Sequence, residues 1–518
     1  MTRCGTWALA IALIVLPGLA AATDPFESND IRAPMTKVDA LVFGRLQKLG
    51  IAPANPCSDP VFVRRVYFDA IGTLPTADEV RAFLADNNPG KRDALIDRLL
   101  SRPEFADYWA MKWCDILRVK SEFPINLWPT AVQAYHHWIR ASLQQNMPYD
   151  RFARELLTAS GSNFRSPPVN FYRAVQSREP ATLAQAAALT FMGSRTDKWP
   201  KEQLDGMAAF FSRVGYKSTA EWKEEIVFFD AAKANAPPEG VLPDGTKVKL
   251  SPDQDPREVF ANWLVSPGNA WFARNAVNRI WAWLMGRGII RETDDIRPDN
   301  PPDNPALLAY LEHELVASRY DLKQIYRLIL KSRTYQLACI PKSSDPRAET
   351  DFACCMVRPL DAEVLIDAVN QITGSTEKYI SAIPEPYTFI PESERTIALA
   401  DASISSPFLE LFGRSPRDTG LAAERNDRPT GAQRSHMLNS SHIQNKIDRS
   451  DKLRALLWTQ GKPRDAVDAL YLTILSRYPT DEELKTIAEY KQDGTAGRRV
   501  GLDLAWALIN TAEFQYRH

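Results

Sequence analysis

The chain has 518 residues, of which 45% are hydrophobic and 25% are charged, and these values exclude wholesale disorder. A chain of this length is expected to fold into two or three domains. Its 63 Lys and Arg residues nearly balance its 64 Asp and Glu residues, so no long-range field is expected to attract nucleic acid or anionic lipid.

The N-terminal segment MTRCGTWALAIALIVLPGLAAATDP has the pattern of a secretory signal peptide. Arg3 is followed by an apolar run over residues 7–19 and by small residues at 20–22, where cleavage is expected. No later stretch reaches about 18 uninterrupted apolar residues, the length that a membrane-spanning helix needs. We therefore expect residues 1–22 to be a signal peptide and the mature chain to be extracytoplasmic, without a transmembrane segment.

Two kinds of local signal predict helices. The segment MTKVDALVFGRLQKLG at residues 35–50 has apolar residues at the spacing of an amphipathic helix. Thr76 with Glu79, and Thr480 with Glu483, have the spacing of a capping box that precedes an apolar stripe. A helix is therefore predicted to begin at each of these two threonines.

A further helical pattern occurs three times, in LIDRLLSRPEFADYW from Leu95, LKQIYRLILKSRTYQLA from Leu322 and LDLAWALINTAEFQYRH from Leu502. Each copy has apolar residues at three-to-four spacing, then a small polar residue and an aromatic one. No fixed period links the copies, so the pattern predicts recurring helical hairpins and not a solenoid. The alternative is that any helix packed on another helix has this pattern.

The segment between these helical regions changes character. EIVFFD at 225–230 and TKVKLS at 246–251 are β-prone, and turn signals lie between them, so they are predicted to form a short strand pair in an exposed connection. The expected organisation is an N-terminal helical domain (23–235), a linker with short strands (236–255) and a C-terminal helical domain (256–518). The predicted fold class is mainly α, with helical-hairpin bundles and a small β-strand pair in the inter-domain connection.

No motif with a fixed catalytic or metal-binding mechanism is found. The sequence has no Gly-rich phosphate loop, no G-x-S-x-G, no H-E-x-x-H and no C-x-x-C. His136 and His137 are adjacent, and His436 and His442 are six apart, so neither pair is expected to share a helix face. No metal and no cofactor are therefore expected.

Five cysteines follow the expected signal peptide, too few for a disulfide framework in so long a chain. Cys339 is a candidate to form one disulfide, with Cys354 or with Cys355. The alternative is that the cysteines are buried free thiols that pack as small apolar residues.

Two stretches are dense in polar and aromatic side chains. The first, over residues 107–152, is interpreted as a groove for a sugar or a peptide, because ring faces stack on such ligands and charged groups hold their polar atoms. The alternative is a helix pair with an aromatic core and solvated charges. The candidate lining residues are Trp113, Asp115, Arg118, Lys120, His137, Arg140, Tyr149 and Asp150.

The second stretch, GRSPRDTGLAAERNDRPTGAQRSHMLN, interleaves arginines with acids. Guanidinium groups at this density can hold a sulfate, phosphate or carboxylate bidentately, but the simpler expectation is that internal ion pairs order a loop. Its candidate binding residues are Arg417, Glu424 and Arg425, and its other charged residues are Arg414, Asp418, Asp427, Arg428 and Arg434.

Several motifs resemble two secreted domains of unknown function, numbered 1549 and 1553. FDAIGTLPTADEVRAFL, MPYDRFARELL and GMAAFF resemble the first, and NRIWAWLMGRGI, NPPDNPALLAYL, DLKQIYRLILKSRTYQ and HMLNS resemble the second. The resemblance covers residues 60–518. It implies a helical fold and a family paired in planctomycete and verrucomicrobial proteins and associated with cytochrome c-like modules, but it implies no reaction.

The resemblance also implies that two thiol-bearing elements are missing. Many relatives carry a Cys-x-x-Cys-His-x-His island at the position of residues 193–199 and a Cys-Glu-Cys-Glu-Arg run at 421–425. Here these positions read GSRTDKW and LAAER, which supply no thiolate or imidazole ligand. The hypothesis is that the two loops meet in relatives around a shared metal or haem, which this chain lacks. It requires residues 195–198 to lie near residues 421–425.

Three functional interpretations follow from the sequence. The first is a non-catalytic, extracytoplasmic structural or binding protein, whose partner is an extracellular glycan or another extracytoplasmic protein and not nucleic acid. The alternative is an extracytoplasmic, glycan hydrolase-like enzyme with Asp115 or Asp150 as acid or base, which requires two carboxylates in one cleft. A redox protein of cytochrome-linked systems is the third, and the lack of a haem-attachment motif weakens it.

Overall fold

Helices form most of the molecule, and the mainly-α prediction is confirmed. The structure is a computed structural model that describes residues 25–28, 35–233, 236–426, 428–459, 462–492 and 497–518. The expected signal peptide lies outside the described residues. Within them, no helix combines the length and the apolar character that crossing a bilayer requires.

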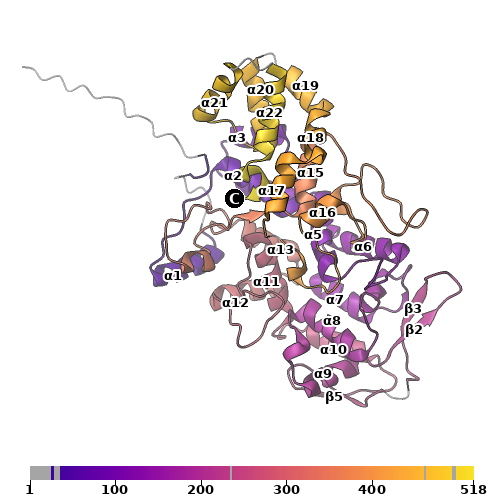
Figure 1. Cartoon of the computed structure of the whole chain (residues 1–518). Coiled ribbons are helices and arrows are strands. Elements are labelled where there is room, and N and C mark those ends of the chain that lie inside the picture. Colours follow the sequence, from indigo (N-terminus) through magenta and orange to yellow (C-terminus); the bar gives the residue numbers. More distant parts are fainter. Residues whose placement is uncertain (1–24, 29–34, 234–235, 427, 460–461, 493–496) are drawn as a thin grey trace, which may run out of the picture.

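The first half of the chain is a set of helices in which α5 packs against α2, α4 and α6, while α8 packs against α9 and α1 against the later helix α12 (Figure 1). Their bounds are α1 (Lys37–Leu49), α2 (Asp59–Ile71), α3 (Ala77–Ala85), α4 (Lys91–Ser101), α5 (Pro103–Ile116), α6 (Pro129–Gln144), α7 (Tyr149–Thr158), η1 (Pro167–Tyr172), α8 (Pro180–Ala187), the π-helical turn η2 (Ala188–Met192), η3 (Thr196–Lys198), α9 (Lys201–Ala208) and η4 (Ala209–Phe211).

The second half continues with helices that pack on this first set and on one another. They are α10 (Pro256–Leu264), α11 (Phe272–Met285), α12 (Pro305–Ala317), α13 (Leu322–Leu330), α14 (Arg347–Thr350), α15 (Ala362–Thr373), η5 (Thr396–Ala398), α16 (Pro407–Leu411), η6 (Ala422–Glu424), α17 (Gly431–Asn439), α18 (Ser441–Asp448), α19 (Asp451–Thr459), α20 (Pro463–Ile474), α21 (Asp481–Gln492), α22 (Gly497–Ile509) and α23 (Ala512–Gln515).

Local capping chemistry sets where several helices begin. The Thr76 amide donates to Glu79 Oε2 (2.8 Å) and the Glu79 amide donates to Thr76 Oγ1 (3.2 Å), which confirms the capping box at the start of α3. The same reciprocal pair joins Thr480 and Glu483 at the start of α21. Each box satisfies two amides that the helix itself leaves without partners.

The strands are few and short, and their pairing differs from the predicted pair. EIVFFD and TKVKLS both contain strands, but β3 pairs with β1 and β2, whereas β5 pairs with β4. Both β3 and β5 thus pair with the strand that directly precedes them, because closing a short hairpin loop costs less entropy than closing a long one. The strands are β1 (Gly161–Ser162), β2 (Val214–Ser218), β3 (Glu225–Phe229), β4 (Glu239–Val241), β5 (Lys247–Lys249), β6 (Arg358–Pro359) and β7 (Tyr516–Arg517).

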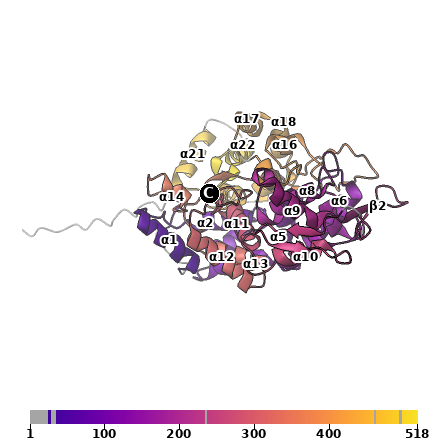
Figure 2. The same ribbon diagram turned by 90° about the horizontal axis from the view of Figure 1, so that it is seen from below.

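The two halves share one continuous apolar core. Trp109 and Trp113 of α5 lie against Trp283 of α11, with ring centroids 5.4 and 5.6 Å apart. The pairing of β6 with β7 brings the last residues of the chain back to the middle of the molecule (Figures 1 and 2). Segments far apart in the sequence therefore meet at the centre, beside the C-terminal ends of α5 and α11.

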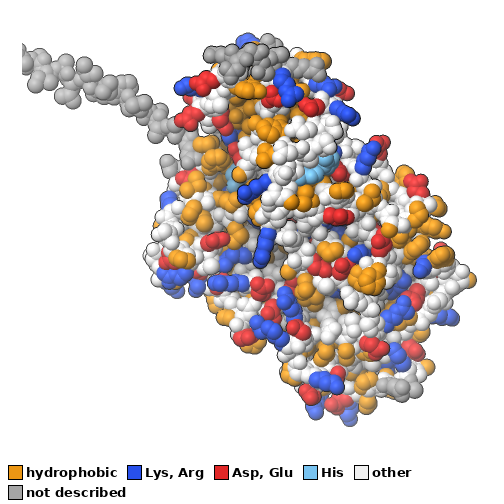
Figure 3. Space-filling view, viewed as in Figure 1, with side chains coloured by type: hydrophobic (Ala, Val, Ile, Leu, Met, Phe, Trp, Pro, Cys, Tyr) orange, Lys and Arg blue, Asp and Glu red, His pale blue; other side chains and the backbone are white. Residues whose placement is uncertain are grey.

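The surface carries charges of both signs. In the view of Figure 3, basic and acidic side chains are interspersed over the visible face, with hydrophobic side chains between them. This distribution agrees with the near-zero formal charge of the chain. A concentration of one sign lies instead in the interior, in a cavity at the centre.

Candidate functional site

A charged cavity of about 260 Å³ lies where the two halves of the chain meet. Its wall is formed by α5, α11, the β6–β7 pair and the loop before α17, together with the segment after α11. Its ionisable lining side chains are Lys112, Asp115, Arg279, Arg287, Arg291, Arg358, Asp361, Arg425 and Arg517. Among the described lining residues, seven are thus basic and two are acidic.

Asp115 lies at the C-terminal end of α5 and is held by two arginines of the loop before α17. Arg417 Nε donates to Asp115 Oδ1 (2.9 Å), while Arg425 Nη2 and Nε donate to Asp115 Oδ2 (2.7 and 3.1 Å). Burial raises the pKa of Asp115, but the charges of the two arginines outweigh it and bring the pKa below its usual value. Asp115 is therefore an ionised anchor for this loop.

Arg425 also holds a second buried carboxylate, that of Glu363. Arg425 Nη1 donates to Glu363 Oε2 (2.7 Å) and Arg425 Nη2 to Glu363 Oε1 (3.1 Å), and Arg414 Nε lies 3.3 Å from Glu363 Oε1. Burial raises the pKa of Glu363, yet the charge of Arg425 and the hydrogen bonds from it lower the pKa overall. Arg425 thus bridges the end of α5 and the start of α15.

Asp361, the residue before α15, is the second acidic group in the cavity wall. Lys112 Nζ donates to Asp361 Oδ1 (2.6 Å), and Arg517 Nη2 and the Tyr108 hydroxyl donate to Oδ2 (2.7 and 3.1 Å). Even with this partner, the pKa of Lys112 falls to about 8, because burial and the charges of Arg425 and Arg517 outweigh the effect of Asp361. The electrostatic environment at Lys112 therefore disfavours a further positive charge.

Positive charge exceeds negative charge in the whole network of ion pairs around the cavity. Nine basic side chains share six carboxylates in these ion pairs. The network therefore has an excess of three basic groups. The basic ones are Lys112, Arg279, Arg287, Arg291, Arg358, Arg414, Arg417, Arg425 and Arg517, and the carboxylates are Asp69, Asp115, Asp294, Asp303, Asp361 and Glu363.

Four of these cations have a buried nitrogen without a hydrogen-bond partner among the described residues, and Arg279 is the one on α11 in the cavity wall. The side chain of Arg279 is only 2% exposed, and its Nη2 lies 3.0 Å from Asp294 Oδ1 and donates to the Leu189 carbonyl (2.8 Å). Its Nε donates to Asn275 Oδ1 (2.9 Å), but its buried Nη1 has no hydrogen-bond partner among the described residues. A buried donor without a partner costs about 1–3 kcal/mol, so an acceptor that reached Nη1 would relieve this cost.

The two loops of the shared-site hypothesis, at residues 193–199 and 421–425, contact the same turn beside the cavity. The Ile296 amide donates to the Gly193 carbonyl (2.8 Å), and Ser194 Oγ donates to the Ile296 carbonyl (3.0 Å). From the other loop, the Ala422 amide donates to Asp294 Oδ2 (2.6 Å). Gly193, Ser194 and Ala422 thus lie against residues 294–296, and the shared-site hypothesis, which concerns residues 195–198, stays a prediction.

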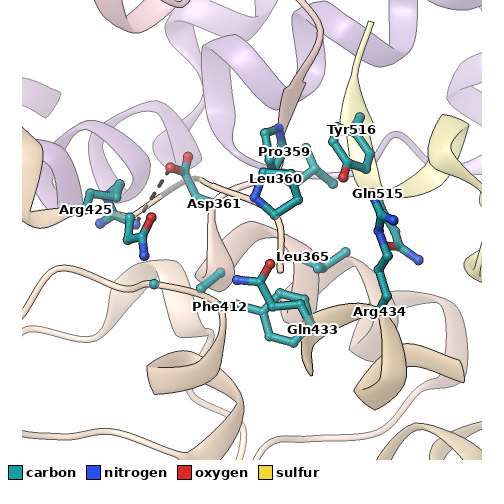
Figure 4. A pocket seen from close by; sticks show the side chains of 14 residues that line it. Pro359, Leu360, Asp361, Leu365, Phe412, Arg425, Gln433, Arg434, Gln515 and Tyr516 are labelled. Carbon is teal, nitrogen blue, oxygen red and sulfur yellow. Dashed lines mark ion pairs between the residues drawn. The ribbon is translucent and has the colours of Figure 1, made fainter. Parts of the chain in front are cut away.

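A smaller hollow lies on the other side of the Arg425–Asp361 pair (Figure 4). In Figure 4, the side chains of Arg425 and Asp361 point toward one another, with Arg425 Nη1 3.7 Å from Asp361 Oδ1. Both residues, together with Pro359, also line the larger cavity. This ion pair therefore forms part of the wall that separates the two spaces.

The structure divides the residues of the first polar stretch among three places and does not gather them in one groove. Trp113 and Tyr149 are buried and pack with Phe152 in the aromatic core, as the alternative interpretation holds. Asp115 lines the charged cavity. His137 and Arg140 line a separate outer groove.

The remaining candidates lie outside these two spaces. Arg118 is buried and its Nε donates to the Ala174 carbonyl (2.6 Å), and Lys120 pairs with Asp418 (2.6 Å). Asp150 lies at the start of α7 and is not part of the cavity lining, although its Oδ1 is buried without a partner in the described part of the chain. Glu424 accepts a hydrogen bond from the Thr419 amide (2.7 Å) and so orders its own loop.

Ion pairs do organise the arginine-rich loop, but their partners differ from those expected. Arg414, Arg417 and Arg425 pair with carboxylates of α5 and α15 and not with the acids between them in the sequence. Asp427 lies outside the described residues. The loop is therefore attached to the core of the molecule through its arginines.

The expectation that His436 and His442 lie apart is wrong. Their ring nitrogens are 3.3 Å apart, because α17 ends at Asn439 and α18 begins with the cap Ser440, so the two residues do not belong to one helix. His442 Nε2 also lies 3.0 Å from Glu377 Oε2. Within the part of the chain that the structure describes, no group of three or more His, Cys, Asp or Glu residues is suited to a metal ion.

The five cysteines of the described region are free thiols. Cys57 and Cys114 are buried, as the packing alternative holds, and Cys339, Cys354 and Cys355 are half-buried. The hydrogen bond between the thiols of Cys339 and Cys355 lowers the pKa of Cys355 to about 7. Cys339 thus lies beside Cys355, one of its two candidate partners, and both side chains are free thiols.

Much of the cavity wall consists of residues that the sequence did not mark as candidates. Lys112 and Arg279 each lie within an apolar helical stretch, Lys112 next to Trp113 and Arg279 next to Ile280. A charged residue on a buried helix face is the signal that marks both of them, since charges are rarely buried without partners. Arg358, Asp361 and Arg517 carry no such signal, because only the tertiary fold brings them together.

Comparison with known families matches most of the chain. Residues 37–215 match the family described as a protein of unknown function (DUF1549), and residues 256–491 match the family described as a protein of unknown function (DUF1553). No curated protein and no solved structure matches the chain. Lys112 and Asp115 lie in the first matched segment, and Arg279, Asp361 and Arg425 in the second, so both segments build the cavity. The chain therefore contains both of these domains of unknown function, one after the other.

Proposed function

We propose that this protein is an extracytoplasmic, non-catalytic binding protein that holds a small oxyanion in the charged cavity between its two family segments. The observation that carries the proposal is the charge of the cavity network, in which nine basic side chains share six carboxylates. A bound oxyanion would compensate part of this excess and would accept hydrogen bonds from guanidinium groups.

The size and the chemistry of the cavity suit such a ligand. A volume of about 260 Å³ greatly exceeds the roughly 30 Å³ that one water molecule occupies in the liquid, so an oxyanion fits together with several waters. Guanidinium groups match the geometry of carboxylate, phosphate and sulfate oxygens, and Arg279 has a buried donor that finds no acceptor among the described residues. The class of ligand is therefore a phosphate-, sulfate- or carboxylate-bearing small molecule.

The geometry gives less support to the hydrolase alternative. A general acid must carry a proton near neutral pH, but the charges of Arg425 and Arg417 keep the pKa of Asp115 below its usual value. Both oxygens of Asp115 accept hydrogen bonds from arginines, and Asp150 is not in the cavity lining. Asp361 also lines the cavity, but Lys112, Arg517 and Arg425 keep its pKa well below its usual value, so neither carboxylate of this cleft carries the proton that a general acid needs, which favours binding without bond cleavage.

Export is supported by the signal-peptide pattern of residues 1–22. Expression of the full chain followed by cell fractionation tests this part of the proposal. We expect the protein in the extracytoplasmic fraction with an N-terminus, determined by mass spectrometry, that follows residue 22. An unprocessed chain confined to the cytoplasm would contradict export. It would not bear on anion binding, which is tested separately by titration.

Anion binding is tested by isothermal titration calorimetry at low ionic strength with sulfate, phosphate and malonate. Arg291 lines the cavity, is exposed at its mouth and pairs with Asp303, so Arg291→Gln removes one charge with little effect on the core. We expect this variant to bind roughly tenfold more weakly, as the loss of one nearby charge in a medium of intermediate dielectric predicts.

The matched control is Arg274→Gln. Arg274 lies on α11, also pairs with a single carboxylate, Glu312, and is not part of the cavity lining. Its replacement should leave the affinity unchanged. The proposal fails if none of the three anions binds, or if Arg274→Gln weakens binding as much as Arg291→Gln does.

A further inference from the structure

Three aromatic side chains from distant parts of the chain form a cluster on the outside of the molecule. The rings of Trp128 and Trp222 are nearly parallel, with centroids 5.8 Å apart and an angle of 19° between their planes. Tyr387 lies edge-on to Trp128 at 5.3 Å and 6.5 Å from Trp222. We call these three residues the aromatic triad. Trp222 is 63% exposed and Tyr387 is 53% exposed, so large ring faces contact water.

The elements that carry the triad hold it at one edge of the molecule. Trp128 immediately precedes α6, Trp222 lies in the turn between β2 and β3, and Tyr387 belongs to the long loop between α15 and α16. Figure 1 places α6, the β2–β3 hairpin and this loop on the same side, where Figure 3 shows hydrophobic side chains at the surface. Lys223 Nζ lies 5.4 Å from the centroid of Trp128, which adds a cation–π contact.

The backbone at Trp128 is strained. Its φ of 73° and ψ of 144° belong to a region that residues other than glycine rarely adopt. The conformation is retained although a tryptophan there costs free energy, and such strain is concentrated at functional sites in proteins. The strain at Trp128 therefore favours a functional role for this position.

A groove of about 750 Å³ begins at the triad, because Tyr387 is a member of both. Polar side chains of α6 and of the loop after α15 line it, and Phe389 adds a further exposed ring. The groove also contains His136, which is only 7% exposed and whose buried Nε2 has no hydrogen-bond partner within the described ranges. The polar side chains that could contact a ligand are Gln133, His136, His137, Arg140 and Glu394.

The groove differs from the central cavity in its charge. Its described lining has two arginines and three carboxylates, and both arginines are paired: Arg140 with Asp107, and Arg395 with Asp367 at 3.7 Å. Burial and the neighbouring Arg417 and Arg140 lower the pKa of His136 to about 3, so its imidazole is neutral near pH 7. The groove thus presents neutral hydrogen-bonding groups, two paired arginines and a small excess of carboxylate beside open aromatic faces.

This combination matches the chemistry of an uncharged sugar chain. The apolar faces of sugar rings stack on aromatic rings, and their hydroxyls bind to amide, imidazole and paired ionic groups without a net charge. We propose that the groove and the aromatic triad form a binding site for a neutral oligosaccharide, separate from the anion cavity. A proline-rich peptide also prefers aromatic grooves, but it does not need the polar groups that line this one.

The test uses the full protein and four neutral hexasaccharides, cellohexaose, xylohexaose, mannohexaose and laminarihexaose, in calorimetric titrations. At least one of them is expected to bind, with the same affinity in the presence and absence of sulfate. Trp222→Ala and Tyr387→Ala are each expected to weaken binding about fivefold to tenfold through the loss of one stacking ring. Gln133→Ala, which removes only polar contacts, should also weaken it.

The matched control is Trp458→Ala on α19, a tryptophan that is exposed to a similar extent and lies away from the groove (Figure 1). Circular dichroism of each variant verifies that the fold is retained. The proposal is overturned if no hexasaccharide binds, if Trp222→Ala and Tyr387→Ala bind as Trp458→Ala does, or if a decaproline peptide binds to the groove and the sugars do not.

Discussion

Arg425 and Asp115 lie 310 positions apart in the sequence and are joined by two hydrogen bonds, of 2.7 and 3.1 Å, in the interior. Asp115 belongs to the first family segment and Arg425 to the second. The same guanidinium also holds Glu363. One side chain therefore links the end of α5, the start of α15 and the loop before α17, and these elements together shape the cavity.

Replacing Arg425 should be strongly destabilising. In Arg425→Met, Glu363 keeps Arg414 and Asp115 keeps Arg417, but both buried carboxylates lose their best-placed donor. Breaking a buried ion pair on one side costs about 3–5 kcal/mol. Urea unfolding should report a loss of that size. Arg81→Met, which breaks an exposed pair with Asp78, should change the free energy of unfolding by less than about 1 kcal/mol. Similar losses in both variants would contradict the linking role of Arg425.

Gly420 is predicted to be irreplaceable for steric reasons. Its φ is +78°, and an added Cβ would lie 2.7 Å from the Ile116 carbonyl oxygen and from Arg118 Nη1. Gly50 has a similar φ of +71° but open space around it, so it is the matched control. Gly50→Ala should cost about 1 kcal/mol from backbone strain alone, and Gly420→Ala at least about 1 kcal/mol more because the loop must move.

Thermal and urea unfolding of the two glycine variants measure this difference directly. Gly420→Ala should also weaken anion binding, since the displaced loop carries Arg417 and Arg425. Equal destabilisation of both variants would show that the loop can move away from Ile116 and Arg118 at no cost in free energy. That result would contradict the steric role predicted for Gly420.

His136 should make the protein less stable as the pH falls. Its pKa in the folded state is about 3, because burial disfavours the charged ring, whereas an unfolded chain has a histidine pKa of about 6.5. Between these values the unfolded state binds the additional proton, so the free energy of unfolding decreases as the pH is lowered from 6.5 toward 3. The slope contributed by this one group is about 1.4 kcal/mol per pH unit.

Urea unfolding at several pH values between about 4.5 and 7 measures this slope. In His136→Gln, the slope of the free energy of unfolding against pH should decrease by the contribution of about one proton. This decrease is expected whatever the substitution does to the stability at neutral pH. Arg274→Gln, which replaces a group that stays charged over this pH range, is the control and should leave the slope as it is. A slope unaltered in His136→Gln would mean that the buried ring does not remain neutral in the folded protein at these pH values.

Lys112 should couple anion binding to pH. Its pKa of about 8 reflects burial first, then the charges of Arg425 and Arg517. A bound anion favours the ammonium form, so the complex holds more protons than the free protein and the affinity should fall as the pH rises above about 8. Titrations between about pH 7 and 10 should show this fall in the wild type and not in Lys112→Met. An affinity that rises over this range would contradict an anion bound next to Lys112.

Local signals in the sequence predict α1 and the starts of α3 and α21 correctly. The capping boxes at Thr76 and Thr480 and the apolar spacing of residues 35–50 depend only on neighbours within one or two turns. The strand segments at 225–230 and 246–251 are also recognisable. Their pairing is not, because propensity says which residues form strands and not which strands are partners.

The charged cavity depends on contacts that no local pattern encodes. Asp115 and Arg425 are separate candidates in the sequence, and only the fold shows that they bind each other. For His436 and His442, one cap residue, Ser440, invalidates an argument from helical spacing. The aromatic triad likewise combines three loops that are distant in the chain.

Anomalous diffraction from crystals of the protein soaked in selenate is the strictest test of an anion site in the cavity, because selenium is located without reference to the surrounding side chains. We expect a selenate ion inside the charged cavity, within hydrogen-bonding distance of guanidinium groups that include Arg279. We also expect its loss from crystals of Arg291→Gln soaked at a limiting concentration. Selenate bound only at the outer surface, with none in the cavity, would contradict the proposed anion site.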